Sequence, residues 1–157
     1  MLTLTEQNEL RKIADEYIRQ VVDAIKNKPI ERKGQQGNFS APVNASGKLA
    51  DSVQSELFAS GIRVTALGYI DTLIYGRKPG TMPPVSAIES WMQAKGLGGS
   101  PYGIAHNIGR YGSTIWQRWQ GQDSGLLSDV DIERQLTELD EWLAEKYGNL
   151  VFAELAA

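Results

Sequence analysis

The sequence contains no cysteine and a single histidine, and both features narrow the chemistry open to the chain. Without cysteine there is no disulfide and no thiolate ligand for a metal, which fits assembly in a reducing compartment. With His106 as the one imidazole, a zinc site would need carboxylates for almost every ligand, and no spaced cluster of them is present. We therefore expect no metal site and no bound cofactor.

Long apolar runs and a strong excess of one charge are also missing. No apolar run approaches the roughly 20 residues that a membrane-spanning helix needs. The opening MLTLTEQNEL lacks the basic and then apolar order of a signal peptide. The net charge of −3 argues against a protein whose main task is to grip DNA by its phosphates. These features predict a soluble, cytosolic chain that folds as a single domain over residues 1–157.

Apolar residues recur at helical spacing in four segments and predict an α+β fold with a long N-terminal helix. The four helices are expected at about 5–27, 84–95, 101–111 and 128–147. Thr3 or Thr5 can cap the first, and Ser128 with Asp131 resembles a capping box for the last. The buried stripe of the last helix is expected to consist of Ile132, Leu136, Leu139, Leu143 and Tyr147.

Strands are predicted in one place, and a long irregular segment in another. Two β-prone runs flank Ser60-Gly61, which predicts an antiparallel hairpin; the alternation of Ile62 and Val64 with polar residues predicts one buried face. Residues 69–75 fit either a strand or a short helix. Residues 28–46 are polar and Gly-rich without periodicity, so we expect a mobile or partner-binding loop that carries Phe39. Ser46 can cap a short turn after it.

The sequence GRKPGTMPP, residues 76–84, combines a rigid turn with two positive charges. Gly76 and Gly80 permit unusual backbone dihedrals, and Pro79 fixes one angle between them. The two prolines at 83 and 84 prepare the start of the following helix. We expect this turn to redirect the chain at a fixed angle and to hold Arg77 and Lys78 at a subunit boundary, facing carboxylates of a neighbour.

Several residues invite a chemical role. His106 could serve as a base beside a serine or work with a carboxylate, as in a small hydrolase, but it fits an ordinary helical surface position better. Trp116 and Trp119 could stack on nucleic-acid bases, although aromatics at a subunit interface or in a small core are commoner. A DNA-binding module therefore remains an alternative, and no motif implies an enzyme.

The order of the motifs resembles the HK97-like tail-component family of tailed bacteriophages, over about residues 46–113. A Gly-Lys/Arg-Leu-x-x-Ser segment comes first, followed by a Gly-Arg-x-Pro-Gly…Pro-Pro turn and a tryptophan-bearing helix that ends in Lys-Gly-Leu. The matching residues are Gly47, Lys48, Leu49, Ser52, Gly76, Arg77, Pro79, Gly80, Pro83, Pro84, Trp91, Lys95, Gly96, Leu97, Ala105, Ile108 and Gly112. After residue 113 the sequence departs from the family pattern.

The resemblance implies a structural virion protein, assembled in the bacterial cytoplasm, that forms an oligomeric ring at the neck or upper tail. Such a ring would help to join head to tail, contact the neighbouring connector and tail proteins, and let genomic DNA pass without specific binding. The family carries no catalytic residues over. The candidate subunit-interface residues are Arg77, Lys78, Pro79, Phe39, Trp116 and Trp119.

Overall fold

The longest apolar stripe of the sequence forms helix α1, Leu4–Asn27, as predicted. The computed structural model describes residues 3–58, 61–130 and 132–155. Thr3 caps the helix in a complete capping box: its side chain accepts from the Glu6 amide at 3.3 Å, and the Glu6 carboxylate accepts from the Thr3 amide at 2.7 Å. Lys28 follows the last turn in an extended conformation, and the chain continues into a strand.

Residues 29–42 form a β-hairpin, so the irregular loop predicted for 28–46 is wrong. Strand β1, Pro29–Gly34, pairs antiparallel with β2, Gly37–Pro42, and the register matches Pro29 with Pro42. Ile30 is buried in the core, while the side chains of β2 are mostly exposed. The two strands therefore show no clear hydrophobic alternation. Their stability comes from pairing and from packing against a helix distant in sequence, which outweighs weak local propensity.

The second hairpin agrees with its prediction. Strand β3, Gln54–Phe58, pairs antiparallel with β4, Gly61–Thr65. Phe58 pairs with Gly61, so Gly61 belongs to the strand rather than to the turn; Ser60 lies outside the described residues. The predicted buried face is only partly covered, because Ile62 is half-buried and Val64 remains 36% exposed. The described residues thus form two separate two-stranded sheets where one was expected.

Six further helices complete the described chain, and three of their positions were predicted. They are α2 Lys48–Asp51, α3 Ile70–Tyr75, α4 Val85–Lys95, α5 Pro101–Tyr111, α6 Thr114–Trp119 and α7 Ile132–Leu155. Helices α4 and α5 agree with prediction, and α3 settles the open choice at 69–75 in favour of helix. Gly47, not Ser46, is the N-cap of α2, and no side chain caps that turn. Helix α6 was not predicted.

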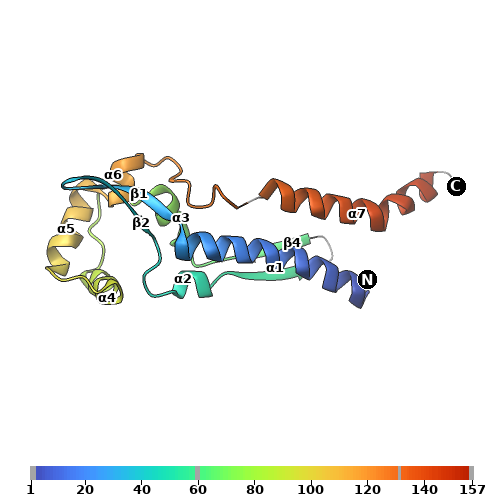
Figure 1. Ribbon diagram of the computed structural model, residues 1–157, viewed down its shortest axis with the longest axis horizontal. Coiled ribbons are helices and arrows are strands. Elements are labelled where there is room, and N and C mark those ends of the chain that lie inside the picture. The colour runs from blue at the N-terminus through green and yellow to red at the C-terminus, as the bar shows by residue number, and fades with distance from the viewer. Residues whose placement is uncertain (1–2, 59–60, 131, 156–157) are drawn as a thin grey trace.

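The elements form an elongated molecule around α1 (Figure 1). Helix α7 runs along one side of α1, the β3–β4 hairpin lies along another, and helices α4 and α5 pack on each other at the end far from both termini. A hydrophobic core cluster joins the C-terminal half of α1 to β1, α2, α6 and the segment before α7. Its buried members are Val21, Ala24, Ile25, Ile30, Val43, Leu49, Ala50, Val53, Ile115, Leu126 and Val130.

Helix α7 begins at Ile132, four residues after the predicted start, and its predicted buried stripe is wrong at Leu136 and Leu143, while Leu139 is half-buried. Leu136 is 54% exposed and Leu143 is 41% exposed, whereas Trp142 is buried. Helix α7 contacts α1 along a narrow strip. This contact buries Trp142 and does not cover the whole apolar stripe. The side chains of Ile132 and Tyr147 lie outside the described residues, as does the proposed capping residue Asp131.

A polar contact ties α7 to α1 and predicts a pH effect. The Trp142 indole donates to Glu9 Oε2 at 2.8 Å, and the Lys146 ammonium lies 3.3 Å from the same oxygen. The indole hydrogen bond, followed by the lysine contacts, lowers the pKa of Glu9 below its ordinary value of 4.5. The unfolded chain therefore takes up this proton first as the pH falls. The contact contributes its full stability above about pH 4.5 and loses it as the pH drops through the lower folded pKa.

We expect the indole N–H resonance of Trp142 to shift in an NMR titration with a midpoint below about pH 4.5, since Glu9 is its acceptor. In Glu9→Gln the shift should vanish, because the titrating acceptor is gone. Glu16→Gln is the matched control: the pKa of Glu16 is also lowered, but by Gln20 and Arg19 on the same helix. A Trp142 resonance that still titrates in Glu9→Gln would contradict this assignment.

Candidate subunit interface

Residues 76–84, here called the elbow, connect α3 to α4 and adopt the predicted special backbone. Gly76 ends α3 at φ 76°, and Gly80 lies at φ 139°, both in the region that favours glycine. Pro84 is the N-cap residue of α4, which begins at Val85. The expectation that glycine and proline redirect the chain into this helix is confirmed.

Hydrogen bonds hold the elbow against two helices that follow it in the sequence. The Arg77 amide donates to Ser113 Oγ, and the Ser113 amide donates to the Arg77 carbonyl, each at 2.9 Å. Ser113 Oγ also accepts from the Trp116 amide at 3.2 Å and so caps α6. The Gly80 amide donates to the Gly109 carbonyl of α5 at 2.8 Å. The elbow is therefore a fixed joint between α3, α5 and α6.

Three glycines with positive φ surround Trp116. A Cβ added to Gly76 would lie 2.3 Å from the Trp116 amide nitrogen, and one added to Gly112 would lie 2.6 Å from Trp116 Cδ1. At Gly121 the added Cβ would lie 2.8 Å from Trp116 Cζ3. These distances leave no room for a side chain. Trp116, one of the predicted interface residues, is thus an internal wedge beside the elbow and is half-buried.

The three elbow residues predicted at the interface differ in what they contact. Arg77 is half-buried, and its Nη2 donates to the Thr81 carbonyl at 3.1 Å, so its guanidinium reinforces the turn. Lys78 and Pro79 are exposed. Neither Arg77 nor Lys78 forms an ion pair with another of the described residues. Both charges remain available to an acid outside the chain.

The other two predicted interface residues lie on or against the first hairpin. Trp119 donates from Nε1 to the Glu31 carbonyl of β1 at 2.8 Å, and the guanidinium of Arg118 lies 5.0 Å from the Trp119 ring centroid. Arg118 also pairs with the Glu31 carboxylate at 2.8 Å. Trp119 therefore joins α6 to β1 within the molecule. Phe39, on β2, is 45% exposed, and its ring lies close to Gly34 of β1, where an added Cβ would be 3.1 Å from Phe39 Cδ1.

His106 lies on the exposed surface of α5, with its ring stacked on that of Tyr102 at a centroid distance of 6.2 Å. It forms no ion pair with an acid within the described part of the chain. Among those same residues, no three His, Asp or Glu side chains are placed to hold a metal ion. Within the ranges that the structure covers, no helix is both long and apolar enough to cross a bilayer.

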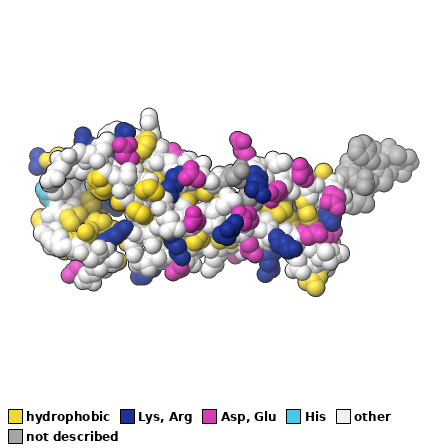
Figure 2. Space-filling view, in the orientation of Figure 1, with side chains coloured by type: hydrophobic (Ala, Val, Ile, Leu, Met, Phe, Trp, Pro, Cys, Tyr) yellow, Lys and Arg dark blue, Asp and Glu magenta, His cyan; other side chains and the backbone are white. Residues whose placement is uncertain are grey.

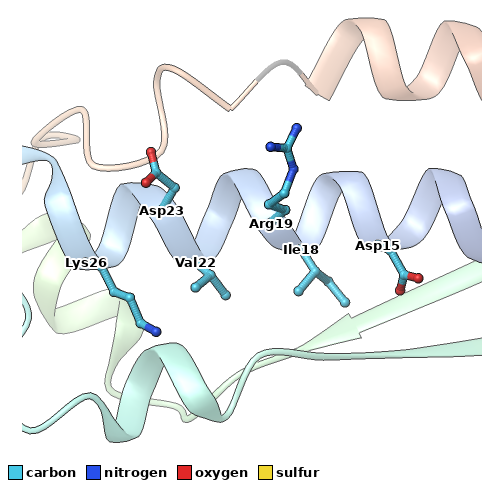
Figure 3. A pocket seen from close by; sticks show the side chains of 6 residues that line it. All are labelled: Asp15, Ile18, Arg19, Val22, Asp23 and Lys26. Atoms are coloured by element: carbon cyan, nitrogen blue, oxygen red, sulfur yellow. The ribbon is translucent and has the colours of Figure 1, made fainter.

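A shallow groove follows one flank of α1 (Figure 3). Ile18 and Val22 point to the same side of the helix, while Arg19 and Asp23 point the opposite way. Asp15 and Lys26 complete the lining, so every wall residue comes from a single helix. The groove is a partly covered helix flank with mixed charge, whose Ile18 and Val22 also pack against the core.

Sequence reasoning missed the partners that fix the elbow. Ser113 follows a glycine and precedes the α6 segment, which is typical of an N-cap, yet the short helix itself was not expected. Gly109 contributes its carbonyl to Gly80, and its Cα lies so close to the elbow that an added Cβ would be 3.1 Å from Met82 Cα. Hydrogen bonds between backbone atoms do not require particular side chains, so the sequence does not reveal them.

No protein-family model, no curated protein and no solved structure matches the chain.

Proposed function

We propose that this protein is a structural virion subunit of a tailed bacteriophage that assembles into a ring at the neck or upper tail. The ring would help to join head to tail and let DNA pass through its opening. The motif order over residues 46–113, described above, supports this family assignment. The chain is proposed to work through its surfaces rather than through a reaction centre.

The observation that carries the proposal is the amount of exposed surface. Taken over all residues, including those outside the described ranges, the chain exposes 10,418 Å². A compact folded monomer of 17.3 kDa is expected to expose about 7,800 Å². The excess of about 2,600 Å² is larger than the roughly 800 Å² that each partner buries in a protein–protein contact of standard size. A subunit that presents so much surface is suited to contacts with neighbours.

Exposed apolar residues lie at several places on the molecule, and three of them lie on or directly after α4 and α5. Figure 2 shows hydrophobic side chains at the α4–α5 end and in smaller patches along the body of the molecule, where most of the charged side chains lie. Tyr102 of α5 is 60% exposed, Tyr111 is 52% exposed and Leu97, after α4, is 48% exposed. Aromatic residues are enriched at protein interfaces, where they supply large contact areas. This end and the elbow beside it form the proposed ring contact.

Ring formation can be tested directly on the purified chain. Native mass spectrometry and negative-stain microscopy should reveal a closed oligomer, either of the chain alone or after neighbouring virion proteins are added. A heterologous contact that closes on itself produces a ring of one defined size. A chain that stays monomeric under both conditions, or that forms only open filaments, would contradict the proposal.

Reversing the elbow charges is expected to abolish this assembly. In Arg77→Glu/Lys78→Glu two cations become acids, so an attraction to a neighbour's carboxylates becomes a repulsion. Lys78→Glu alone tests the interface without disturbing the turn, because it leaves the hydrogen bond from Arg77 to the Thr81 carbonyl in place. Lys12→Glu, on the exposed surface of α1, is the matched control and should assemble normally. Unchanged ring formation in the double variant would refute the interface role of the elbow.

A further inference from the structure

Two cations from distant parts of the chain converge on one carbonyl oxygen. Arg32 Nη2 of β1 donates to the Pro42 carbonyl at 3.1 Å and to the Ala41 carbonyl at 3.3 Å. Lys95 Nζ, at the end of α4, donates to the same Pro42 carbonyl at 3.3 Å. Arg32 Nη2 and Lys95 Nζ therefore lie close together, because both donate to the same oxygen atom. This contact also joins the α4 end of the molecule to the first hairpin.

No acid of the described chain neutralises this pair. Neither Arg32 nor Lys95 takes part in an ion pair there, and the nearest acid in sequence, Glu31, is bound to Arg118. Both cations are half-buried, and Arg32 Nε is buried with no acceptor among the described residues. Partly buried charges are normally paired, because the loss of solvation otherwise goes uncompensated.

The pKa shifts of Arg32 and Lys95 agree with the absence of an acid beside them in the described part of the chain. Burial lowers the pKa of the Arg32 guanidinium below its ordinary value. Burial, and then the positive charge of Arg32, lowers the pKa of Lys95. Each shift marks a cation whose charged form lacks a compensating partner. The attraction of an anion placed between the two groups would offset both penalties.

We infer that Arg32 and Lys95 form a binding site for an oxyanion, either a carboxylate from a neighbouring copy of this chain or a free phosphate ion. A guanidinium offers five N–H donors in a planar fork and an ammonium offers three. Only Nη2 of Arg32 and one bond from Lys95 are engaged with acceptors in the described structure. The remaining donors suit an acceptor with two or more oxygens, which can bridge the two cations.

The position of Lys95 explains why the site is built at this point. It is the last residue of α4, and Gly96 stops the helix in a left-handed conformation. The side chain can therefore reach across to the end of β2 instead of continuing along a helical surface. Lys95 is also the first residue of the Lys-Gly-Leu sequence at the end of this helix, and anion binding would give this lysine a function. A neighbour's carboxylate as the source rests on the proposed ring, whereas phosphate binding does not.

Phosphate binding tests the site on the isolated chain. Inorganic phosphate and, separately, acetate are titrated at constant ionic strength against sodium chloride, and the amides of Val43 and Gly96 are followed by NMR. Saturable shifts are expected in the wild type. Lys95→Gln should weaken binding by about tenfold or more, since a hydrogen bond to a charged group is lost. Lys95→Arg should retain binding, which shows that the fold tolerates a change at this position.

Lys33→Gln is the matched control, because Lys33 is an exposed cation on the same strand. It should bind phosphate within about twofold of the wild type, since exposed charges interact weakly across solvent. Absence of saturable shifts with either anion would overturn the inference. An equal loss in Lys33→Gln and Lys95→Gln would overturn it as well, because the effect would then be general screening.

Sedimentation velocity distinguishes the two sources. If a neighbour's carboxylate fills the site, phosphate should compete with it, and both added phosphate and Lys95→Gln should weaken self-association. If the ligand is a free phosphate ion, self-association should be the same with and without phosphate while the NMR shifts persist. Either result supports the anion site. If no ring forms, the phosphate titration still tests the site, because it does not depend on self-association.

Discussion

Gly76→Ala is expected to lower the free energy of unfolding by about 3–5 kcal/mol, because strain and overpacking act together there. Gly76 adopts φ 76°, which disfavours any residue with a Cβ. The added Cβ would meet the Trp116 amide nitrogen at 2.3 Å and Trp116 Cα at 2.6 Å. These are backbone atoms held by the Ser113 cap, so they cannot rotate away as the end of a flexible side chain could. Urea denaturation followed by circular dichroism measures the change.

Gly68→Ala is the control for this substitution. Gly68 precedes α3, a methyl group added to it would meet no other atom within 4 Å, and its backbone is not in the left-handed region. Its stability should change by less than about 1 kcal/mol, the range seen when alanine replaces glycine without strain. Equal losses in the two variants would show that the elbow is not specifically intolerant of a side chain.

Gly76→Ala should also loosen the elbow before the whole chain unfolds. The Gly80 and Ser113 amides donate to Gly109 and Arg77, so their hydrogen exchange reports on this joint. We expect faster exchange at both amides, with α1 amides such as that of Ile25 affected only through global unfolding. If the proposed ring forms through the elbow, the same variant should assemble poorly at temperatures where it is still folded.

Leu126→Ala is expected to destabilise the chain by about 2–5 kcal/mol, as buried leucine truncations do. Leu126 has no exposed surface, although it lies in an irregular segment between α6 and α7. It belongs to the same core cluster as Ile25 and Ile30. Ser124 holds this segment in place, because its amide donates to the Ile74 carbonyl at 2.9 Å. Truncation would therefore leave a cavity whose walls are held by their own contacts and cannot fully close.

Leu97→Ala provides the comparison, since Leu97 is 48% exposed and follows α4. It should cost less than about 1 kcal/mol, because little buried apolar surface is lost. Thermal or urea unfolding of both variants and of the wild type measures the change in the free energy of unfolding. A Leu126→Ala chain as stable as Leu97→Ala would mean that residues 120–130 merely cover the core and contribute nothing to it.

The predicted elements that the structure confirms share a strong local signal. Helix α1 combines a capping residue with a long apolar stripe, and α5 combines a Ser100 cap with proline at its first position. The β3–β4 hairpin has two β-prone runs that lie close together in the sequence. In each case neighbouring residues along the chain supply most of the information, so the pattern is visible without the fold.

The errors fall where partners distant in sequence supply the stabilising contacts. The β1–β2 hairpin has the sequence of a polar loop, yet Arg118 and Trp119 of α6 bind its Glu31 from 87 and 88 positions along the chain. Helix α7 has an apolar stripe in its sequence, but its contact with α1 is narrow, so Trp142 is buried while Leu136 and Leu143 stay exposed. Burial on a helix depends on which neighbour is present, and periodicity alone does not report that.

The sequence by itself determined the α+β class, the long first helix and the dihedral demands of the elbow, because capping residues, glycine and proline act through local backbone geometry. Only the tertiary structure decided that Trp116 is enclosed by three glycines, that residues 29–42 are a hairpin, and that Arg32 and Lys95 meet at the Pro42 carbonyl. These features depend on contacts that local sequence patterns do not encode, and their energies come from packing and desolvation, which exist only once the chain has folded.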